Sequence, residues 1–252
     1  MPLRKVYFIK LVNLSEFEIL TYEGEVSKSY IKFLSSLGKV FSVSESPNIY
    51  TGGLNKTGAN GKFAIFFGDS TFQLVFHVTN LIGEKESPHD THQNNLYDIR
   101  KKLIGNDYVN IVWLENSHQE FDPCLIISGA ILLYLVINPV SDTHFAVKIK
   151  HNKRARFNLA DKVSAYFNED LCVSVENSSL KEYIINMVIR LNLLISYQLQ
   201  KTVYNKIEIE SQLNSVNLVK HNALQIGFDT NITQRFKEIE RINYRFKNNF
   251  YN

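Results

Sequence analysis

Apolar residues occur along the chain in short runs that are separated by polar or glycine-containing turns. Runs that alternate, or that are rich in β-branched and aromatic residues, predict β-strands. Such runs fall at residues 5–12, 17–22, 39–43, 108–113, 130–137 and 144–150. The first two are close enough to form a hairpin through residues 13–15. The runs at 62–69 and 72–82 either continue the sheet or supply a buried helix, because the periodicity of the second does not decide between them.

Other segments space their apolar residues at intervals of three and four, which predicts helices. These segments are residues 27–38, 95–104, 158–167, 179–200 and 232–246. Ser27 and Gly38 are suited to begin and end the first helix, and Ser179 with Glu182 forms a capping box for the fourth. The polar stretch 89–95 predicts a surface loop. Because strands and helices interleave, we expect an α/β fold with a central mixed sheet flanked by helices.

The composition changes from about Lys201, where Asn, Glu, Lys and Arg become frequent. We therefore divide the chain into a main domain at residues 1–200 and a helical C-terminal extension at residues 201–252. One face of the last predicted helix collects the apolar side chains Ile232, Phe236, Ile239 and Phe246. We expect this face to pack on the main domain or on another subunit, which would make a homo- or hetero-oligomer through the C-terminal helices.

Composition and charge exclude several classes of protein. The 252 residues are 44% hydrophobic and 21% charged, which is typical of a globular protein. The net charge of +3 is too small to indicate a nucleic-acid-binding protein. The longest apolar run, residues 124–137, is shorter than the roughly 20 residues of a membrane-spanning helix, so no transmembrane segment is predicted. Two cysteines and the lack of a secretory leader lead us to expect a cytoplasmic location.

Positive charge is nevertheless concentrated in one place. Residues 143–160 contain no carboxylate, and five cations fall among them: Lys148, Lys150, Lys153, Arg154 and Arg156. This cluster is either a solvated loop after a strand or a local patch that attracts an acidic partner surface or a nucleotide phosphate.

Familiar catalytic and cofactor motifs are missing from the sequence. His89 and His92 lie in a polar stretch without a Cys cluster or a His-Glu-x-x-His pattern, so we predict no metal site. The glycines between residues 52 and 61 do not have Walker spacing, and they predict two tight turns around a short strand. Cys124 lies in an apolar run and is expected to be inert, and no Gly-x-Ser-x-Gly elbow supports a catalytic serine. We therefore expect no bound cofactor.

One residue remains as a candidate for chemistry. Asn106 stands where a basic helical segment must end and the strand at 108–113 must begin. Gly-Asn-Asp is ordinary turn chemistry, because Gly and Asn tolerate positive φ and Asp bonds to nearby backbone N–H groups. The alternative is a functional carboxamide that the following strand holds on a rigid mount.

The segment KKLIGNDYVNIVWLE, residues 101–115, resembles a block of the GTPase-activating domains of the Rap, Ral and tuberin type. That block reads Lys-Arg-His-Ile-Gly-Asn-Asp and is followed by a strand. Further matching segments occur in the same order at residues 30–41, 50–54, 72–82, 121–129 and 133–149. The resemblance extends from about Tyr7 to about Tyr197, and it implies a fold similar to the G domain itself.

The resemblance also implies a function. In this family an asparagine, called the thumb, enters the nucleotide site of a bound small GTPase, and the matching residue here is Asn106. Its carboxamide would orient the water that attacks the γ-phosphate. Lys101 and Lys102 match the family's basic pair, and together with Asp107 they are expected to bind the GTPase. The charge cluster adds Lys153, Arg154 and Arg156 to the expected GTPase-binding residues. GTP and Mg²⁺ would belong to the partner, a Rap-, Ral- or Rheb-like GTPase of the Ras superfamily, and not to this chain.

Two departures from the family pattern bear on the expected site. Leu103 replaces the histidine that precedes Ile-Gly-Asn-Asp, and Ala130 replaces a phenylalanine. If that histidine supports the thumb, its loss would lower activity. Two hypotheses therefore stay open: an active GTPase-activating domain, or a catalytically silent relative that binds a GTPase or scaffolds a complex.

Overall fold

A computed structural model describes residues 2–11, 15–68, 72–83, 89–115, 118, 120–141, 143–155 and 172–213. The predicted helices at 158–167 and 232–246 lie outside the described residues, so oligomerisation through the C-terminal helices stays a prediction. The backbone contacts divide the chain into two compact units, Met1–Leu194 and Ile195–Asn252. The described part of the second unit is helical.

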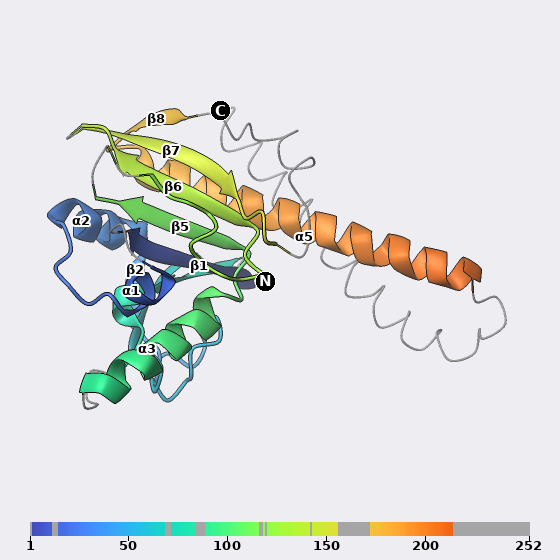
Figure 1. Cartoon of the computed structure of the whole chain (residues 1–252), viewed down its shortest axis with the longest axis horizontal. Helices are drawn as coiled ribbons and strands as arrows, with labels where there is room; N and C mark the ends of the chain where they lie inside the picture. The colour runs from blue at the N-terminus through green and yellow to red at the C-terminus, as the bar shows by residue number, and fades with distance from the viewer. Residues whose placement is uncertain are drawn as a thin grey trace. The chain divides into compact units, whose positions relative to one another are not determined.

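The first unit is built on a sheet whose described strands number eight (Figure 1). In chain order they are β1 (Pro2–Leu11), β2 (Lys39–Ser42), β3 (Phe63–Gly68), β4 (Gln73–Val78), β5 (Val109–Leu114), β6 (Leu133–Pro139), β7 (His144–His151) and β8 (Val173–Glu176). Their order across the sheet is β2-β3-β4-β1-β5-β6-β7-β8. The central pairs β4-β1, β1-β5 and β5-β6 are parallel, and the outer pairs are antiparallel. The predicted mixed sheet is therefore confirmed.

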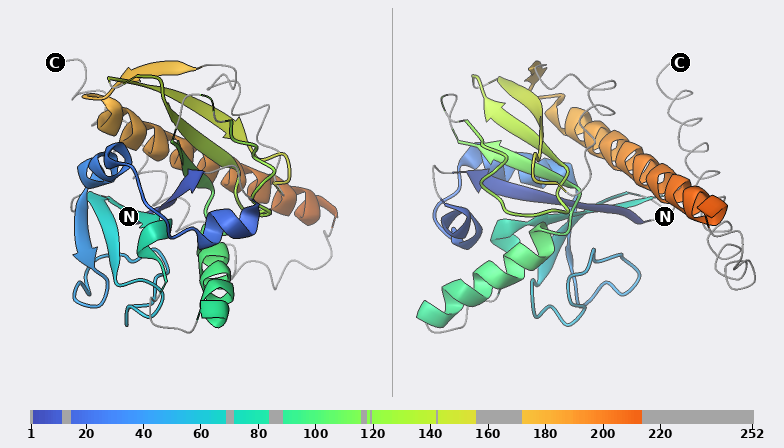
Figure 2. Two further views of the ribbon diagram at one scale, coloured as in Figure 1. Left: turned by 60° about the vertical axis from the view of Figure 1, so that its left-hand side comes forward. Right: turned by 45° about the vertical axis from the view of Figure 1, so that its right-hand side comes forward.

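Helices cover both faces of this sheet (Figures 1 and 2). The described helices are α1 (Glu16–Thr21), α2 (Lys28–Leu37), the 3₁₀ helix η1 (Thr79–Leu81), α3 (His89–Ile104) and α5 (Leu180–Leu213). One face of the sheet is covered by α1 and α3, and the other by α2 and by the part of α5 at residues 180–194.

Strand β5 explains why both faces need cover, because all six of its residues are buried. Val112 and Leu114 belong to the apolar cluster under α1 and α3. On the opposite face, the Trp113 ring lies 5.2 Å from the ring of Phe33 in α2 and 5.2 Å from the ring of Phe145 in β7. A strand that is apolar on both faces is typical of the parallel centre of an α/β sheet.

The strand predicted at 17–22 is wrong, since these residues lie mostly in α1. The physical reason is a capping box that the sequence also contains. The Glu18 backbone N–H donates to the Ser15 Oγ at 3.4 Å, and the Ser15 backbone N–H donates to the Glu18 carboxylate at 2.8 Å. This box starts a helix, and the neighbours of β1 are β4 and β5 instead of a hairpin partner.

Of the other local predictions, some are confirmed and some are wrong. The helix at 27–38 is confirmed as α2, with Ser27 as its N-cap. Gly38 follows it because a Cβ there would lie 2.1 Å from the carbonyl oxygen of Phe66. The loop predicted at 89–95 is instead the beginning of α3, and the glycine-rich stretch forms turns without the short strand expected between them. Strand β8 was not predicted.

Candidate functional site

Asn106 is exposed at the junction between the end of α3 and the start of β5. Its Nδ2 donates a hydrogen bond of 2.7 Å to the carbonyl oxygen of Lys102, in the last turn of α3. Within the described residues, its Oδ1 accepts no hydrogen bond. Neither Gly105 nor Asn106 has a positive φ, so the tolerance for left-handed backbone that the sequence suggested is not used here. The carboxamide is thus anchored through its nitrogen and leaves an acceptor oxygen at the surface.

Gly105 is required at this junction for space. A Cβ at residue 105 would lie 2.7 Å from the Lys101 carbonyl oxygen. The carbonyl oxygen of Gly105 accepts a hydrogen bond of 2.6 Å from the Ser128 Oγ, and that Oγ accepts one of 3.1 Å from the backbone N–H of Ala130. Ser128 therefore holds the residue before Asn106 against the loop that precedes β6.

Asn152 extends this connection to the basic cluster. Its buried Nδ2 donates to the carbonyl oxygens of Ser128 at 2.8 Å and Ile131 at 2.9 Å. Its Oδ1 accepts a hydrogen bond of 3.0 Å from the backbone N–H of Arg154. Asn152 thereby fixes the turn after β7 on which Lys153 and Arg154 are exposed.

The strand register places these residues at one edge of the sheet. Val109, three residues after Asn106, pairs with Leu133 of β6, and Leu133 pairs with His151 of β7. The start of β5 and the end of β7 therefore lie at the same edge of the sheet, with the start of β6 between them. Lys153 and Arg154 follow Asn152 just after the end of β7. Arg156, the last cation of the predicted cluster, lies outside the described residues.

The two lysines of α3 differ in their surroundings. Lys102 is exposed next to Asn106. The Lys101 Nζ forms an ion pair with the Glu16 carboxylate, which also accepts hydrogen bonds from the Tyr97 hydroxyl at 3.1 Å and from the Ile127 backbone N–H at 2.6 Å. Lys101 thus ties α3 to α1, and an intramolecular carboxylate already partly compensates its charge.

Asp107 does not suit the role that we expected for it. Its side chain is only 3% exposed, so a direct contact with a GTPase does not fit this position. One carboxylate oxygen lies 3.7 Å from the Nδ1 of the buried His77 in β4. The His77 Nε2 donates a hydrogen bond of 3.1 Å to the carbonyl oxygen of Thr51, beside the paired Gly52 and Gly53. Asp107 therefore lies in the interior beside His77 of β4.

Arg100 is a residue that the sequence interpretation missed. It is buried, and its guanidinium donates hydrogen bonds to the carbonyl oxygens of Ile82 at 3.1 Å, Leu20 at 2.8 Å and Tyr22 at 3.2 Å. Burial lowers the pKa of Arg100 to about 10, and the nearby Glu23 carboxylate acts in the opposite direction. The signal was in the helical spacing, because Arg100 lies four residues before Ile104 on the buried face of α3.

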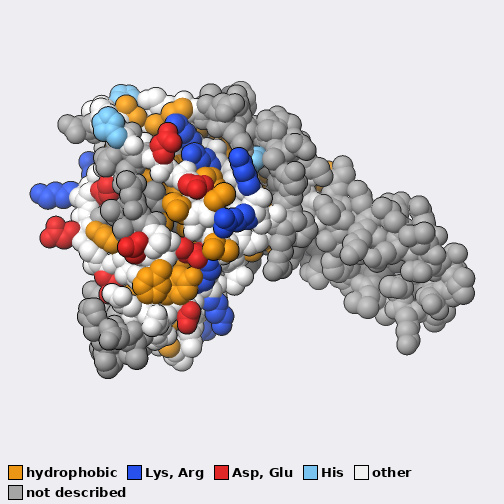
Figure 3. Space-filling model, viewed as in Figure 1, with side chains coloured by type: hydrophobic (Ala, Val, Ile, Leu, Met, Phe, Trp, Pro, Cys, Tyr) orange, Lys and Arg blue, Asp and Glu red, His pale blue; other side chains and the backbone are white. Residues whose placement is uncertain are grey.

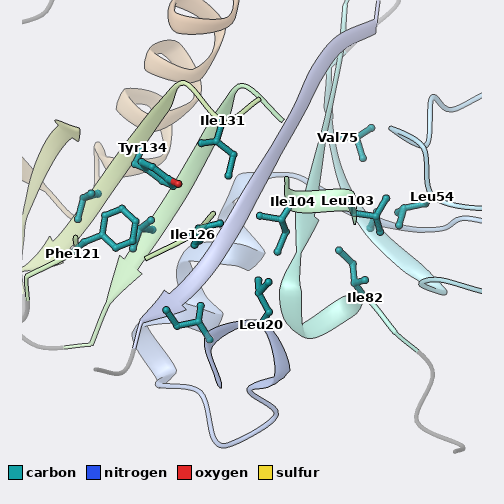
Figure 4. Packing of buried hydrophobic residues seen from close by; sticks show 14 of the residues in the cluster. Leu20, Leu54, Val75, Ile82, Leu103, Ile104, Phe121, Ile126, Ile131 and Tyr134 are labelled. Atoms are coloured by element: carbon teal, nitrogen blue, oxygen red, sulfur yellow. The ribbon is translucent and has the colours of Figure 1, made fainter. Parts of the chain in front are cut away.

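Leu103 is buried in the apolar cluster beneath α1 and α3. Figure 4 shows it next to Leu54, with Val75 and Ile82 in the same region. The departure from the family's histidine therefore changes the packing of this core. Ala130 is half-buried, and its backbone N–H belongs to the Ser128 network described above.

Within the described residues, no three His, Cys, Asp or Glu side chains are grouped so that they could hold a metal ion. In the same part of the chain, every helix is too short or too polar to span a bilayer. The candidate site therefore consists of the exposed Asn106, the exposed cations Lys102, Lys153 and Arg154, and the hydrogen bonds that fix their backbone.

The sheet, with parallel pairs at its centre and helices on both faces, makes this an α/β domain. The sequence model of the Rap/ran-GAP family matches residues 19–189, and the chain belongs to that family. The solved structure of the TSC2 GAP domain shares the fold with a TM-score of 0.63 and 21% identity. That match covers 79% of this chain and 100% of the other.

Two curated relatives are similar to the chain over part of its length. It is 28% identical over 133 residues to the Ral GTPase-activating protein subunit alpha-2 of Mus musculus. It is 27% identical over 154 residues to the Ral GTPase-activating protein subunit alpha-1 of Homo sapiens. These alignments cover 52% and 60% of this chain but only 6% and 7% of the two relatives.

Proposed function

We propose that the chain stimulates GTP hydrolysis by a small GTPase of the Ras superfamily, of the Rap, Ral or Rheb type. Asn106 would act as the thumb, entering the nucleotide site of the partner. The observation that carries this proposal is the exposed carboxamide of Asn106, anchored through its nitrogen to the Lys102 carbonyl oxygen. Membership of the Rap/ran-GAP family supports it independently.

The chemistry needs no titrating group on this chain. Hydrolysis of the γ-phosphate requires an attacking water held in line, with stabilisation of the charge that develops. The Asn106 Oδ1 can accept a hydrogen bond from such a water. Because Gly105 is fixed by Ser128 and α3 is fixed by Arg100, the carboxamide needs little reorganisation when the partner binds. GTP and Mg²⁺ would be supplied by the GTPase.

Charge on the same edge of the sheet favours an acidic partner surface. Lys102, Lys153 and Arg154 are exposed there, and Asn152 orders the turn that carries the last two. Cations around a docking site raise the rate of encounter more than they raise affinity. We also propose a cytoplasmic location, which the free thiols of Cys124 and Cys172 support.

The experiment that tests this function is single-turnover GTP hydrolysis by purified Rap-, Ral- and Rheb-like GTPases, with and without the full chain. We expect at least one of them to hydrolyse GTP faster when the chain is added. Binding of a GTP-loaded GTPase without any acceleration would instead support the catalytically silent module. No acceleration and no binding across the panel would contradict both functions.

A further inference from the structure

An exposed apolar side chain belongs to the loop that is hydrogen-bonded to the Asn106 junction. Ile127 is 59% exposed. The next residue, Ser128, donates its hydroxyl to the Gly105 carbonyl oxygen at 2.6 Å, and Asn106 follows Gly105. Ile127 and Asn106 are thus each one residue away from this hydrogen bond.

The backbone of Ile127 is also held from the other side. Its N–H donates a hydrogen bond of 2.6 Å to the Glu16 carboxylate, which pairs with Lys101 of α3. Two independent contacts thus fix a segment that has no regular secondary structure. An apolar side chain on so constrained a backbone loses little further freedom when a partner covers it.

A second apolar side chain lies beside the same Glu16 carboxylate. Phe17, next to Glu16 in α1, is 38% exposed, and its ring lies 5.3 Å from the ring of Tyr97 in α3. The Tyr97 hydroxyl donates to the same Glu16 carboxylate at 3.1 Å. Figure 3 shows hydrophobic side chains gathered over α1, with charged side chains around them. We call Phe17, Tyr97 and Ile127 the Glu16 patch.

We propose that the Glu16 patch docks the small GTPase, as the apolar part of the surface that carries Asn106. The inference rests on the proposed function and deepens it. The Ser128–Gly105 hydrogen bond joins the loop of Ile127 to the Asn106 junction, and Lys102, whose carbonyl oxygen accepts from Asn106, is exposed on α3. The partner surface that fits is therefore an apolar region, flanked by acidic side chains, at the border of the nucleotide site. An apolar centre with a charged rim is the usual build of a protein–protein interface.

The experiment measures the Kd for a GTPase loaded with a non-hydrolysable GTP analogue, and the KM and kcat of stimulated hydrolysis. The variant is Ile127→Ser, and its matched control is Val140→Ser. Val140 is 58% exposed but follows β6 at the opposite edge of the sheet. We expect Ile127→Ser to raise the Kd and the KM by about tenfold with kcat nearly unchanged, because the contact is made equally before and during the reaction. Val140→Ser should behave as wild type.

The chemistry of the partner is tested by two further substitutions at the same residue. Ile127→Glu should weaken binding more than Ile127→Lys, since the partner surface is expected to be acidic. Thermal unfolding of each variant checks that the fold is kept. Equal Kd values for Ile127→Ser, Val140→Ser and wild type would overturn the docking role of the patch. If Asn106→Ala still abolishes stimulation in that case, the proposed function stands alone, whereas a panel in which no GTPase binds overturns both.

Discussion

The Ser128 hydroxyl donates a hydrogen bond of 2.6 Å to the carbonyl oxygen of Gly105, the residue immediately before Asn106. Through this contact the loop before β6 determines where the end of α3 lies. The same hydroxyl accepts from the backbone N–H of Ala130, so the loop is ordered together with the junction.

Replacing Ser128 by alanine removes this connection without adding bulk. We expect Ser128→Ala to lower the free energy of unfolding by about 1–2 kcal/mol, because a partly buried carbonyl loses its donor. Stimulated hydrolysis should fall through kcat more than through KM, since the carboxamide of Asn106 becomes less well held. The measurements are denaturant unfolding and steady-state kinetics. Ser128→Thr keeps a hydroxyl and should recover part of both losses, whereas equal behaviour of the two variants would contradict the role of the hydroxyl.

Arg100 should matter for stability although it lies in a basic run. Arg100→Met keeps the length of the side chain but leaves the carbonyl oxygens of Leu20, Tyr22 and Ile82 without this donor. We expect a loss of about 3 kcal/mol in the free energy of unfolding. The control is Lys102→Met, two residues along α3 and exposed, which should change stability by less than about 0.5 kcal/mol. Similar losses of unfolding free energy in the two variants would contradict the stabilising role of the Arg100 hydrogen bonds.

Restoring the family's histidine at position 103 tests how this position affects stability. Leu103→His places an imidazole in the apolar cluster that includes Leu54 and Ile82. We expect the free energy of unfolding to fall by about 1–3 kcal/mol, because a buried polar group would lack a partner. Leu103→Met, which conserves volume, should cost less than about 1.5 kcal/mol. A histidine variant as stable as wild type in denaturant unfolding would mean that a polar partner is available at this position.

The cations after β7 are expected to act on encounter. Changing both Lys153 and Arg154 to Glu should lower the association rate with the GTPase by about tenfold at low salt and weaken its salt dependence. Stopped-flow binding at several ionic strengths measures both effects. The control with the same change of charge is Lys28→Glu with Lys32→Glu, on α2 at the other face of the sheet. An equal slowing by both pairs would indicate a response to net charge alone.

Much of the sheet could be predicted from the sequence, because its strands carry the local signals that strands need. The apolar runs of β5 and β6, which are buried along all or most of their length, are examples. The apolar content of residues 17–22 predicts a strand, but the capping box of Ser15 and Glu18, which the prediction did not take into account, starts α1 there. Backbone hydrogen bonds at a helix start outweigh such a short run of β-favourable residues.

Only part of the candidate site could be predicted from the sequence. A motif identifies Asn106, but burial and side-chain partners depend on residues distant in the sequence. Asp107 faces β4 and Arg100 reaches α1, so neither environment can be read from the segment around Asn106. Ser128 and Asn152 were missed because a single polar residue in a loop carries no periodic signal.

The central claim is that the carboxamide of Asn106 acts in GTP hydrolysis by the partner. The direct measurement is the single-turnover hydrolysis rate of a responsive GTPase with saturating wild type or Asn106→Ala. We expect the variant to bind the GTPase nearly as wild type does and to lower the stimulated rate by about 10²-fold or more, the scale of losing one preorganised hydrogen bond in a transition state. Asn106→Asp should be no better, since it adds negative charge beside the γ-phosphate. Equal stimulation by Asn106→Ala and wild type would contradict the claim and leave Asn106 as a residue that only ends α3.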